Sequence, residues 1–194
     1  MSASAAGRVE SVLCWDIDGT LLTTARAGVF ALEEAAREVL DTVPDFSSLP
    51  TAGLTDAEVA ALAIRACGAQ GSAESVAAFL RTYERYLPDR LSWREGHVLP
   101  GVIEVLDHLA SRKDVACILL TGNTEAGARA KLTHYGLLNF FEDGAFCADT
   151  DDREAIARRA HAIALKRYGP DFTAESIYVV GDTPHDVRCG KAIG

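Results

Sequence analysis

Residues 9–22 read VESVLCWDIDGTLL, a short apolar run followed at once by two aspartates and a glycine. Continuous rather than alternating apolarity is typical of a strand that is buried on both faces, as in a parallel sheet covered by helices. We therefore expect a strand that starts near Val9 and ends at Trp15. The pair Asp18-Gly19 can also be read as an ordinary turn, because Asp-Gly is a common turn sequence.

Two further apolar runs follow the same plan. Val115–Leu120 is followed by Thr-Gly-Asn at 121–123, and Ile177–Val180 is followed by Gly-Asp-Thr-Pro at 181–184. Helical patterns lie between these runs, over residues 28–40, 102–110, 123–135 (with Asn123 as the N-cap) and 153–168. Strands that alternate with helices predict an α/β fold. We expect a three-layer α/β/α, Rossmann-like core around a parallel sheet.

One long stretch breaks this alternation. Residues 23–97 contain helical patterns at 56–67 and 73–87 but no strong strand. We interpret the stretch as an inserted all-helical subdomain, so that residues 1–22 and 98–194 together form the core. Tyr83 and Trp93 are expected to lie in the interior of this subdomain, because large aromatic side chains dominate the packing of small cores.

Composition and net charge indicate which partners and which cellular compartment to expect. The chain has 194 residues and a net charge of −9, which repels nucleic acid and anionic membranes, so we expect neither as a partner. The N-terminus lacks the apolar stretch of a signal peptide, and Val115–Leu120 is far too short to span a bilayer. The five cysteines are widely spaced without a Cys-x-x-Cys pair, which favours a reducing compartment. We expect a soluble, cytoplasmic monomer or homodimer.

The polar residues after the three apolar runs are the candidate site. In open parallel sheets ligands bind beyond the carboxyl ends of the strands. The clusters there are Asp16 with Asp18, residues 121–123, and Asp182 with Asp186. Carboxylates that meet in one crevice repel one another unless a cation lies among them, and oxygen ligands without Cys or His favour Mg²⁺. Each cluster alone is compatible with a turn, whereas the three together favour a metal-dependent site.

The order of these clusters resembles the haloacid dehalogenase superfamily. Asp16-Ile17-Asp18-Gly19-Thr20-Leu21 resembles its first motif, Thr121-Gly122-Asn123 its second, and Gly181-Asp182-Thr183-Pro184-His185-Asp186 its fourth. The chain is most similar to the phosphoglycolate phosphatase-like branch, whose helical cap lies between the first and second motifs, where residues 23–97 lie. In that branch a further strand and helix follow the fourth motif, whereas this sequence stops at Gly194. Either the sequence is a shortened form or the sheet lacks this edge, and both readings stay open.

The resemblance implies a role for each motif residue. Asp16 would attack phosphorus and form an aspartyl-phosphate, and Asp18 would protonate the leaving group and then activate water. Asp16, the backbone carbonyl of Asp18, and Asp182 would hold Mg²⁺, with Asp186 as a ligand or a nearby partner. The phosphate would bind to Thr121, Gly122 and Asn123 at a helix N-terminus.

The third motif, a Lys or Arg that offsets charge between nucleophile and phosphate, is not conspicuous in the sequence. Arg153 and Lys131 are the two candidates, and both stay open, since each could equally be an ordinary surface charge. Four further residues lie where caps of this kind reach the site and could contact the substrate: Arg26, Gly53, Thr55 and Asp56.

The expected function is therefore that of a magnesium-dependent phosphatase acting on a small phosphorylated metabolite. A phosphomutase of the β-phosphoglucomutase type is an alternative, because it shares both aspartates of the first motif. A binding protein of the same fold that has lost turnover is a third interpretation, which the obscure third motif favours.

Overall fold

The computed structural model describes residues 8–148, 152–170 and 172–194, so the first seven residues of the expected core lie outside the described residues. Its main sheet has four parallel strands in the order β5-β4-β1-β6. They are β1 (Ser11–Trp15), β4 (Val115–Thr124), β5 (Gly144–Cys147) and β6 (Ile177–Val180). The central pair is β1 and β4, which carry the first two motifs, and β6 with the fourth motif lies beside β1 at the edge.

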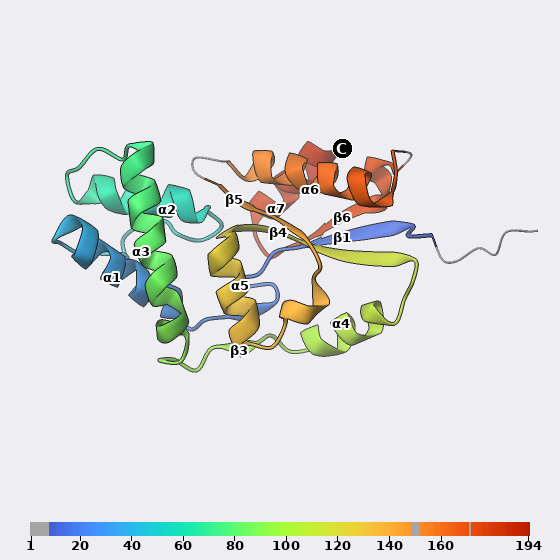
Figure 1. Cartoon of the computed structure of the whole chain (residues 1–194), viewed down its shortest axis with the longest axis horizontal. Helices are drawn as coiled ribbons and strands as arrows, with labels where there is room; N and C mark the ends of the chain where they lie inside the picture. The colour runs from blue at the N-terminus through green and yellow to red at the C-terminus, as the bar shows by residue number, and fades with distance from the viewer. Residues whose placement is uncertain (1–7, 149–151, 171) are drawn as a thin grey trace, which may run out of the picture.

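Helices cover both faces of this sheet (Figure 1). They are α4 (Val102–Ala110) and α5 (Glu125–His134) on one face and α6 (Arg153–Tyr168) and α7 (Pro184–Ile193) on the other. Successive strand residues point to opposite faces: Val12 and Cys14 pack into the apolar cluster that contains α6 and α7, whereas Trp15 packs into the cluster with α4 and α5. The expected three-layer parallel core is confirmed.

Three elements of the core differ most from the sequence prediction. The strand β4 runs on through residues 121–123 to Thr124, so the second motif lies in the end of a strand and Asn123 is not the N-cap of α5. Strand β5 and helix α7 were not predicted, because β5 reads Gly-Ala-Phe-Cys, without the Val, Ile or Leu of the other strands, and α7 begins in the turn sequence of the fourth motif. Two short 3₁₀ turns, Leu138–Phe140 and Ala174–Ser176, complete the core.

The inserted stretch folds into three helices, α1 (Ala27–Leu40), α2 (Asp56–Ala66) and α3 (Ala73–Leu91). The chain enters it through β2 (Leu22–Thr23) and leaves it through β3 (His97–Val98), and these two segments pair antiparallel. The helices lie together at one end of the core (Figure 1). We infer from this arrangement that residues 23–97 form a helical cap on the core.

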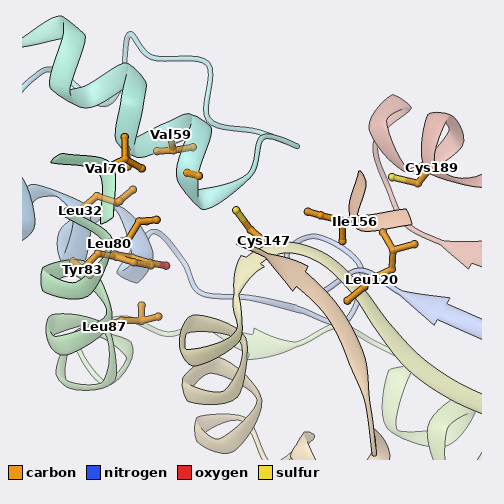
Figure 2. Close-up of a cluster of buried hydrophobic side chains, with 14 of the residues drawn as sticks. Leu32, Val59, Val76, Leu80, Tyr83, Leu87, Leu120, Cys147, Ile156 and Cys189 are labelled. Atoms are coloured by element: carbon orange, nitrogen blue, oxygen red, sulfur yellow. The ribbon is translucent and has the colours of Figure 1, made fainter. Parts of the chain in front are cut away.

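A continuous apolar cluster joins the cap and the core. Figure 2 shows Leu32, Leu80 and Tyr83 of the cap on one side and Leu120 and Ile156 of the core on the other, with Cys147 between them. The expectation for Tyr83 holds, since 2% of it is exposed. That for Trp93 is wrong: the side chain is 58% exposed and lies against the guanidinium of Arg90. Among the described helices none has the length and apolarity needed to cross a bilayer.

Candidate active site

Three carboxylates meet at the carboxyl end of the sheet. Asp16 directly follows β1, Asp182 follows β6, and Asp186 lies in the first turn of α7. Each offers one oxygen, and these oxygens all lie within 4.8 Å of one another. Gly19 permits this approach: its φ is +86°, and a Cβ there would lie 2.8 Å from Cγ of Asp182. The loop of the first motif is therefore shaped to bring Asp182 next to Asp16.

The three carboxylates differ in the donors that already contact them. Both oxygens of Asp186 are engaged, Oδ1 by the guanidinium of Arg153 and Oδ2 by the Thr183 amide (2.9 Å) and hydroxyl (2.6 Å). Among the residues that the structure describes, Asp182 accepts a single hydrogen bond, from the Thr20 hydroxyl at 3.2 Å. Asp16 and Asp182 are thus the carboxylates with capacity for a cation. An all-oxygen set of this kind fits Mg²⁺ better than a softer metal.

The surroundings of Asp16 disfavour the charged form of its carboxyl. Only 5% of the residue is exposed, and burial raises the pKa of its carboxyl to about 6; Arg153 opposes this rise, while Asp186 and Asp18 add to it. The closest cation is the guanidinium of Arg153, with Nη2 3.6 Å from Oδ2 of Asp16. A buried carboxylate that faces other carboxylates requires positive charge nearby to stay ionised.

Asp18 faces the second motif instead of the carboxylate cluster. Its Oδ2 accepts hydrogen bonds from Nζ of Lys131 (2.6 Å) and from Nδ2 of Asn123 (2.8 Å). The Asn123 amide also donates to Thr121 Oγ1 at 2.8 Å, and its Oδ1 accepts from Lys131 at 2.5 Å. These contacts connect the first and second motifs through side chains alone. The helix N-cap is Thr124, whose hydroxyl accepts from the Gly127 amide.

Both candidates for the third motif are buried and line the same cavity. Lys131 is 5% exposed and Arg153 is 6% exposed, so neither is an ordinary surface charge. They hold different partners, since Lys131 contacts Asp18 and Arg153 contacts Asp186 and approaches Asp16. Seven of the nine residues that the sequence singled out as site residues line this cavity; the other two, Thr121 and Asp186, are buried and contact the cavity residues Asn123 and Arg153.

The cap closes over this group and leaves a cavity of about 350 Å³. The loop before α2 seats tightly on the core: a Cβ on Gly122 would lie 2.8 Å from the Leu54 carbonyl oxygen and 3.0 Å from Nη1 of Arg153. Asp56, the first residue of α2, accepts a 2.8 Å hydrogen bond from the Thr124 amide. Of the four cap residues expected near the site, three line the cavity (Arg26, Gly53 and Asp56), whereas Thr55 is buried as the N-cap of α2.

Sequence reasoning missed several residues around the cavity. Thr24 and Tyr83 line it, but nothing in their local sequence distinguishes them from ordinary core positions. Thr183 could have been found, because Thr183 and Asp186 have the spacing of a capping box, in which the two side chains bond each other's backbone amides.

Comparisons with known proteins identify a relative in sequence and structures of the same fold. The chain is 29% identical over 196 residues to "Tyrosine-protein kinase PtkA" of Mycobacterium tuberculosis, covering 99% of this chain and 62% of that protein's length. Two solved structures share the fold. One is a predicted phosphoglycolate phosphatase from Haemophilus somnus, with 16% identity and a TM-score of 0.70, covering 97% of this chain and 84% of that one. The other is a putative β-phosphoglucomutase from Thermotoga maritima, with 19% identity and a TM-score of 0.61, covering 95% of this chain and 82% of that one.

Residues 13–191 match the haloacid dehalogenase-like hydrolase family, a span that includes the strands and loops holding all the carboxylates described above. Because this match covers nearly the whole chain, the resemblance read from the motifs is confirmed. The protein is a member of the haloacid dehalogenase-like hydrolase family.

Proposed function

We propose that the protein is a magnesium-dependent phosphatase, similar to phosphoglycolate phosphatases, that hydrolyses a small phosphorylated metabolite through an aspartyl-phosphate on Asp16. The observation that carries this proposal is the placement of Asp16 beside Asp182 and Arg153 in a cavity that Asp18 also lines. A nucleophile, a cation site and an acid–base group are thereby within reach of one bound phosphate.

In the first step a carboxylate oxygen of Asp16 attacks phosphorus, and the bond from phosphorus to the ester oxygen breaks. Asp18 gives a proton to the departing alkoxide, so an alcohol leaves and Asp18 becomes a carboxylate. In the second step Asp18 takes a proton from water, whose oxygen attacks the same phosphorus. Inorganic phosphate and the Asp16 carboxylate are released, and Asp18 is protonated again.

The other residues would bind and orient the phosphate. Magnesium held by Asp16, Asp182 and the backbone carbonyl of Asp18 would neutralise charge on the phosphoryl oxygens, with Asp186 acting mainly through Arg153. Thr121, Gly122 and Asn123 would supply donors to those oxygens. We assign the third-motif role to Arg153, because its guanidinium lies 3.6 Å from Asp16, and a positioning role to Lys131, which holds Asp18 and Asn123. Positioning and charge neutralisation supply most of the catalysis in phosphoryl transfer.

Hydrolysis of p-nitrophenyl phosphate with and without Mg²⁺ tests the proposal. We expect metal-dependent turnover in the natural sequence and a loss of at least about a thousandfold in Asp16→Asn, because removing a nucleophile removes the covalent route. Asp114→Asn is the matched control, since that aspartate is exposed and pairs with Arg112. An Asp16→Asn protein that folds and keeps the metal-dependent rate would refute the nucleophile assignment.

The second candidate function is transfer of the phosphoryl group to an alcohol instead of to water. The relative named as a tyrosine kinase and the neighbour named as a phosphoglucomutase both point to transfer of a phosphoryl group to a hydroxyl group. An aspartyl-phosphate on Asp16 could react in either way. Measurement of inorganic phosphate release against transfer to added sugar phosphates or to a tyrosine peptide distinguishes the two, and stoichiometric phosphate release favours the phosphatase.

A further inference from the structure

Two short segments join the cap to the core. The chain passes into the cap through β2 and returns through β3, and these two strands pair antiparallel. Each strand is two residues long. Together residues 22–23 and 96–98 form the hinge. A hinge between two rigid parts of a protein is usually a few residues at the ends of elements, so movement of the cap must be taken up here.

The side chain of Tyr135, at the C-terminal end of α5, contacts both segments of the hinge. A Cβ on Gly96 would lie 2.0 Å from Oη of Tyr135 and 2.6 Å from the carbonyl oxygen of Thr23. The phenol therefore occupies the space that a side chain at position 96 would need, and the Thr23 carbonyl lies at the same place. The C-terminal end of α5 and β3 lie near each other in Figure 1, as this contact requires.

The Tyr135 hydroxyl is buried and has no hydrogen-bond partner among the residues that the structure describes. Burial raises the pKa of the phenol despite the opposing effect of Lys131, so the group keeps its proton and requires an acceptor. Buried polar groups are normally paired, and an unpaired one costs free energy. This cost applies only while the hydroxyl is kept away from water.

Helix α5, which carries Tyr135, is held firmly in the core. Lys131 lies one turn before Tyr135, and its carbonyl accepts the Tyr135 amide at 3.0 Å. Nζ of Lys131 donates to Asp18 at 2.6 Å, and the next residue, Leu132, is fully buried. The helix is thus fixed to the catalytic side of the molecule. If Tyr135 and the hinge separate, it is the hinge that moves.

We propose that the Tyr135 hydroxyl favours opening of the cap and thereby speeds the release of product phosphate. With the cap closed, the hinge keeps the hydroxyl away from any acceptor, whereas a shift of the hinge lets water reach it and removes the cost. Tyrosine at this position makes the closed cap less stable, relative to the open one, than phenylalanine would. The effect on release rests on the proposed phosphatase function, and the effect on opening does not.

Hydrogen exchange at the Thr124 amide measures opening without any substrate, because this amide of the core donates to the carboxylate of Asp56 in the cap. In Tyr135→Phe we expect the exchange of Thr124 to slow at least about threefold, since the closed cap no longer contains an unpaired hydroxyl. Tyr178→Phe is the matched control. Tyr178 is 53% exposed, so its hydroxyl is open to water and its removal should leave the exchange of Thr124 unchanged.

Gly96→Ala should act in the opposite direction. Its methyl would clash with the Tyr135 hydroxyl and the Thr23 carbonyl, so we expect the exchange of Thr124 to become at least about threefold faster. Combined with Tyr135→Phe the increase should be smaller, because the shortest of these contacts is to the hydroxyl that phenylalanine lacks.

A merely structural role for the hydroxyl gives a different pattern. If the hydroxyl were equally buried with the cap open, Tyr135→Phe would slow only core amides such as that of Leu119, which donates to the Asp143 carbonyl. An unchanged exchange rate at Thr124 would therefore overturn the inference, whatever the core amides do.

Dissociation of inorganic phosphate in the presence of Mg²⁺ tests the effect on release. We expect it to slow in Tyr135→Phe by the same factor as the exchange of Thr124, because bound phosphate leaves through the open cap. Slower exchange with unchanged dissociation would overturn the link to product release. If inorganic phosphate does not bind at all, the phosphatase proposal fails, while the exchange rates still decide whether Tyr135 favours opening.

Discussion

Gly53 of the cap lies directly against His185 of the core: a Cβ at position 53 would come within 2.7 Å of Cδ2 of the His185 ring. The contact joins the loop before α2 to the fourth motif, and Gly53 has a φ of +72°. Arg188 donates to Nδ1 of His185 at 2.8 Å, which fixes the ring in place beneath the loop. The contact between the cap and the core thus depends on glycine, which has no side chain, at position 53.

We expect Gly53→Ala to lower kcat/KM at least tenfold, because the added methyl prevents the cap from seating and completing the site. Gly68→Ala is a matched control with a similar φ of +79° and no atom within 4 Å of the added Cβ. It should cost about 1 kcal/mol of unfolding free energy through backbone strain and leave activity intact. If the clash is responsible, His185→Ala should recover part of the loss in a double mutant, so additive effects would contradict this explanation.

Asp182→Asn should raise the Mg²⁺ concentration needed for half-maximal activity by about tenfold or more. One of the two carboxylates with free capacity for the cation becomes a neutral amide, while the hydrogen bond from Thr20 can still form. A magnesium titration of p-nitrophenyl phosphate hydrolysis measures the shift. Glu104→Gln, an exposed change on α4, is the control, and an unchanged titration midpoint in Asp182→Asn would exclude Asp182 as a ligand.

Arg153→Lys should reduce kcat by about tenfold or more while the protein stays folded, because lysine keeps the charge but cannot contact Asp186 and Asp16 with one planar group. Arg153→Met should instead destabilise the fold by about 3–5 kcal/mol, since it leaves the buried Asp186 carboxylate unpaired. Steady-state kinetics and urea unfolding measure the two effects. Arg158→Lys, exposed on the same helix, should change neither. A fully active Arg153→Lys would return the third-motif role to Lys131.

Asp56→Asn should stabilise the protein in a pH-dependent way. Burial raises the pKa of this partly buried carboxyl from 3.8 to about 6, against the opposing effect of Lys131. Well below pH 3.8 the acid is protonated in both the folded and the unfolded states, so its burial is not penalised. As pH rises from about 4 to 6 the carboxyl ionises in the unfolded state while it keeps its proton in the folded state, so the folded state loses stability across this range and no further above it.

The free energy of unfolding of Asp56→Asn should therefore equal that of the natural sequence at about pH 3 and exceed it by up to about 3 kcal/mol at pH 7, the equivalent of a pKa difference of about two. Urea unfolding at several pH values without metal measures the difference, with the exposed Asp107→Asn as control. A difference that stays constant from pH 4 to pH 7 would show that the ionisation of Asp56 is not responsible.

Local sequence was sufficient for the elements that carry the chemistry. The apolar runs before Asp16, Thr121 and Asp182 predicted three strands of the sheet, and the rule that ligands bind at carboxyl ends predicted their convergence. Helix α6 was predicted with its observed bounds, because Arg153–Tyr168 ends before Gly169-Pro170. The motif residues are close in sequence to the strand ends that hold them, which is why their grouping could be predicted.

The sequence by itself therefore determined the fold class, the nucleophile candidate and the carboxylates around it. Tertiary packing decided which charged residues pair in the site. Arg153 contacts Asp186, which is 33 residues away in the sequence, and Lys131 contacts Asp18, which is 113 residues away. The contribution of Thr24 and Tyr83 to the cavity was beyond sequence reasoning, because they come from different segments that come together only when α3 packs on α1. Strand and helix patterns depend on neighbours along the chain, whereas pairing of buried polar groups depends on which faces the folded helices bring together.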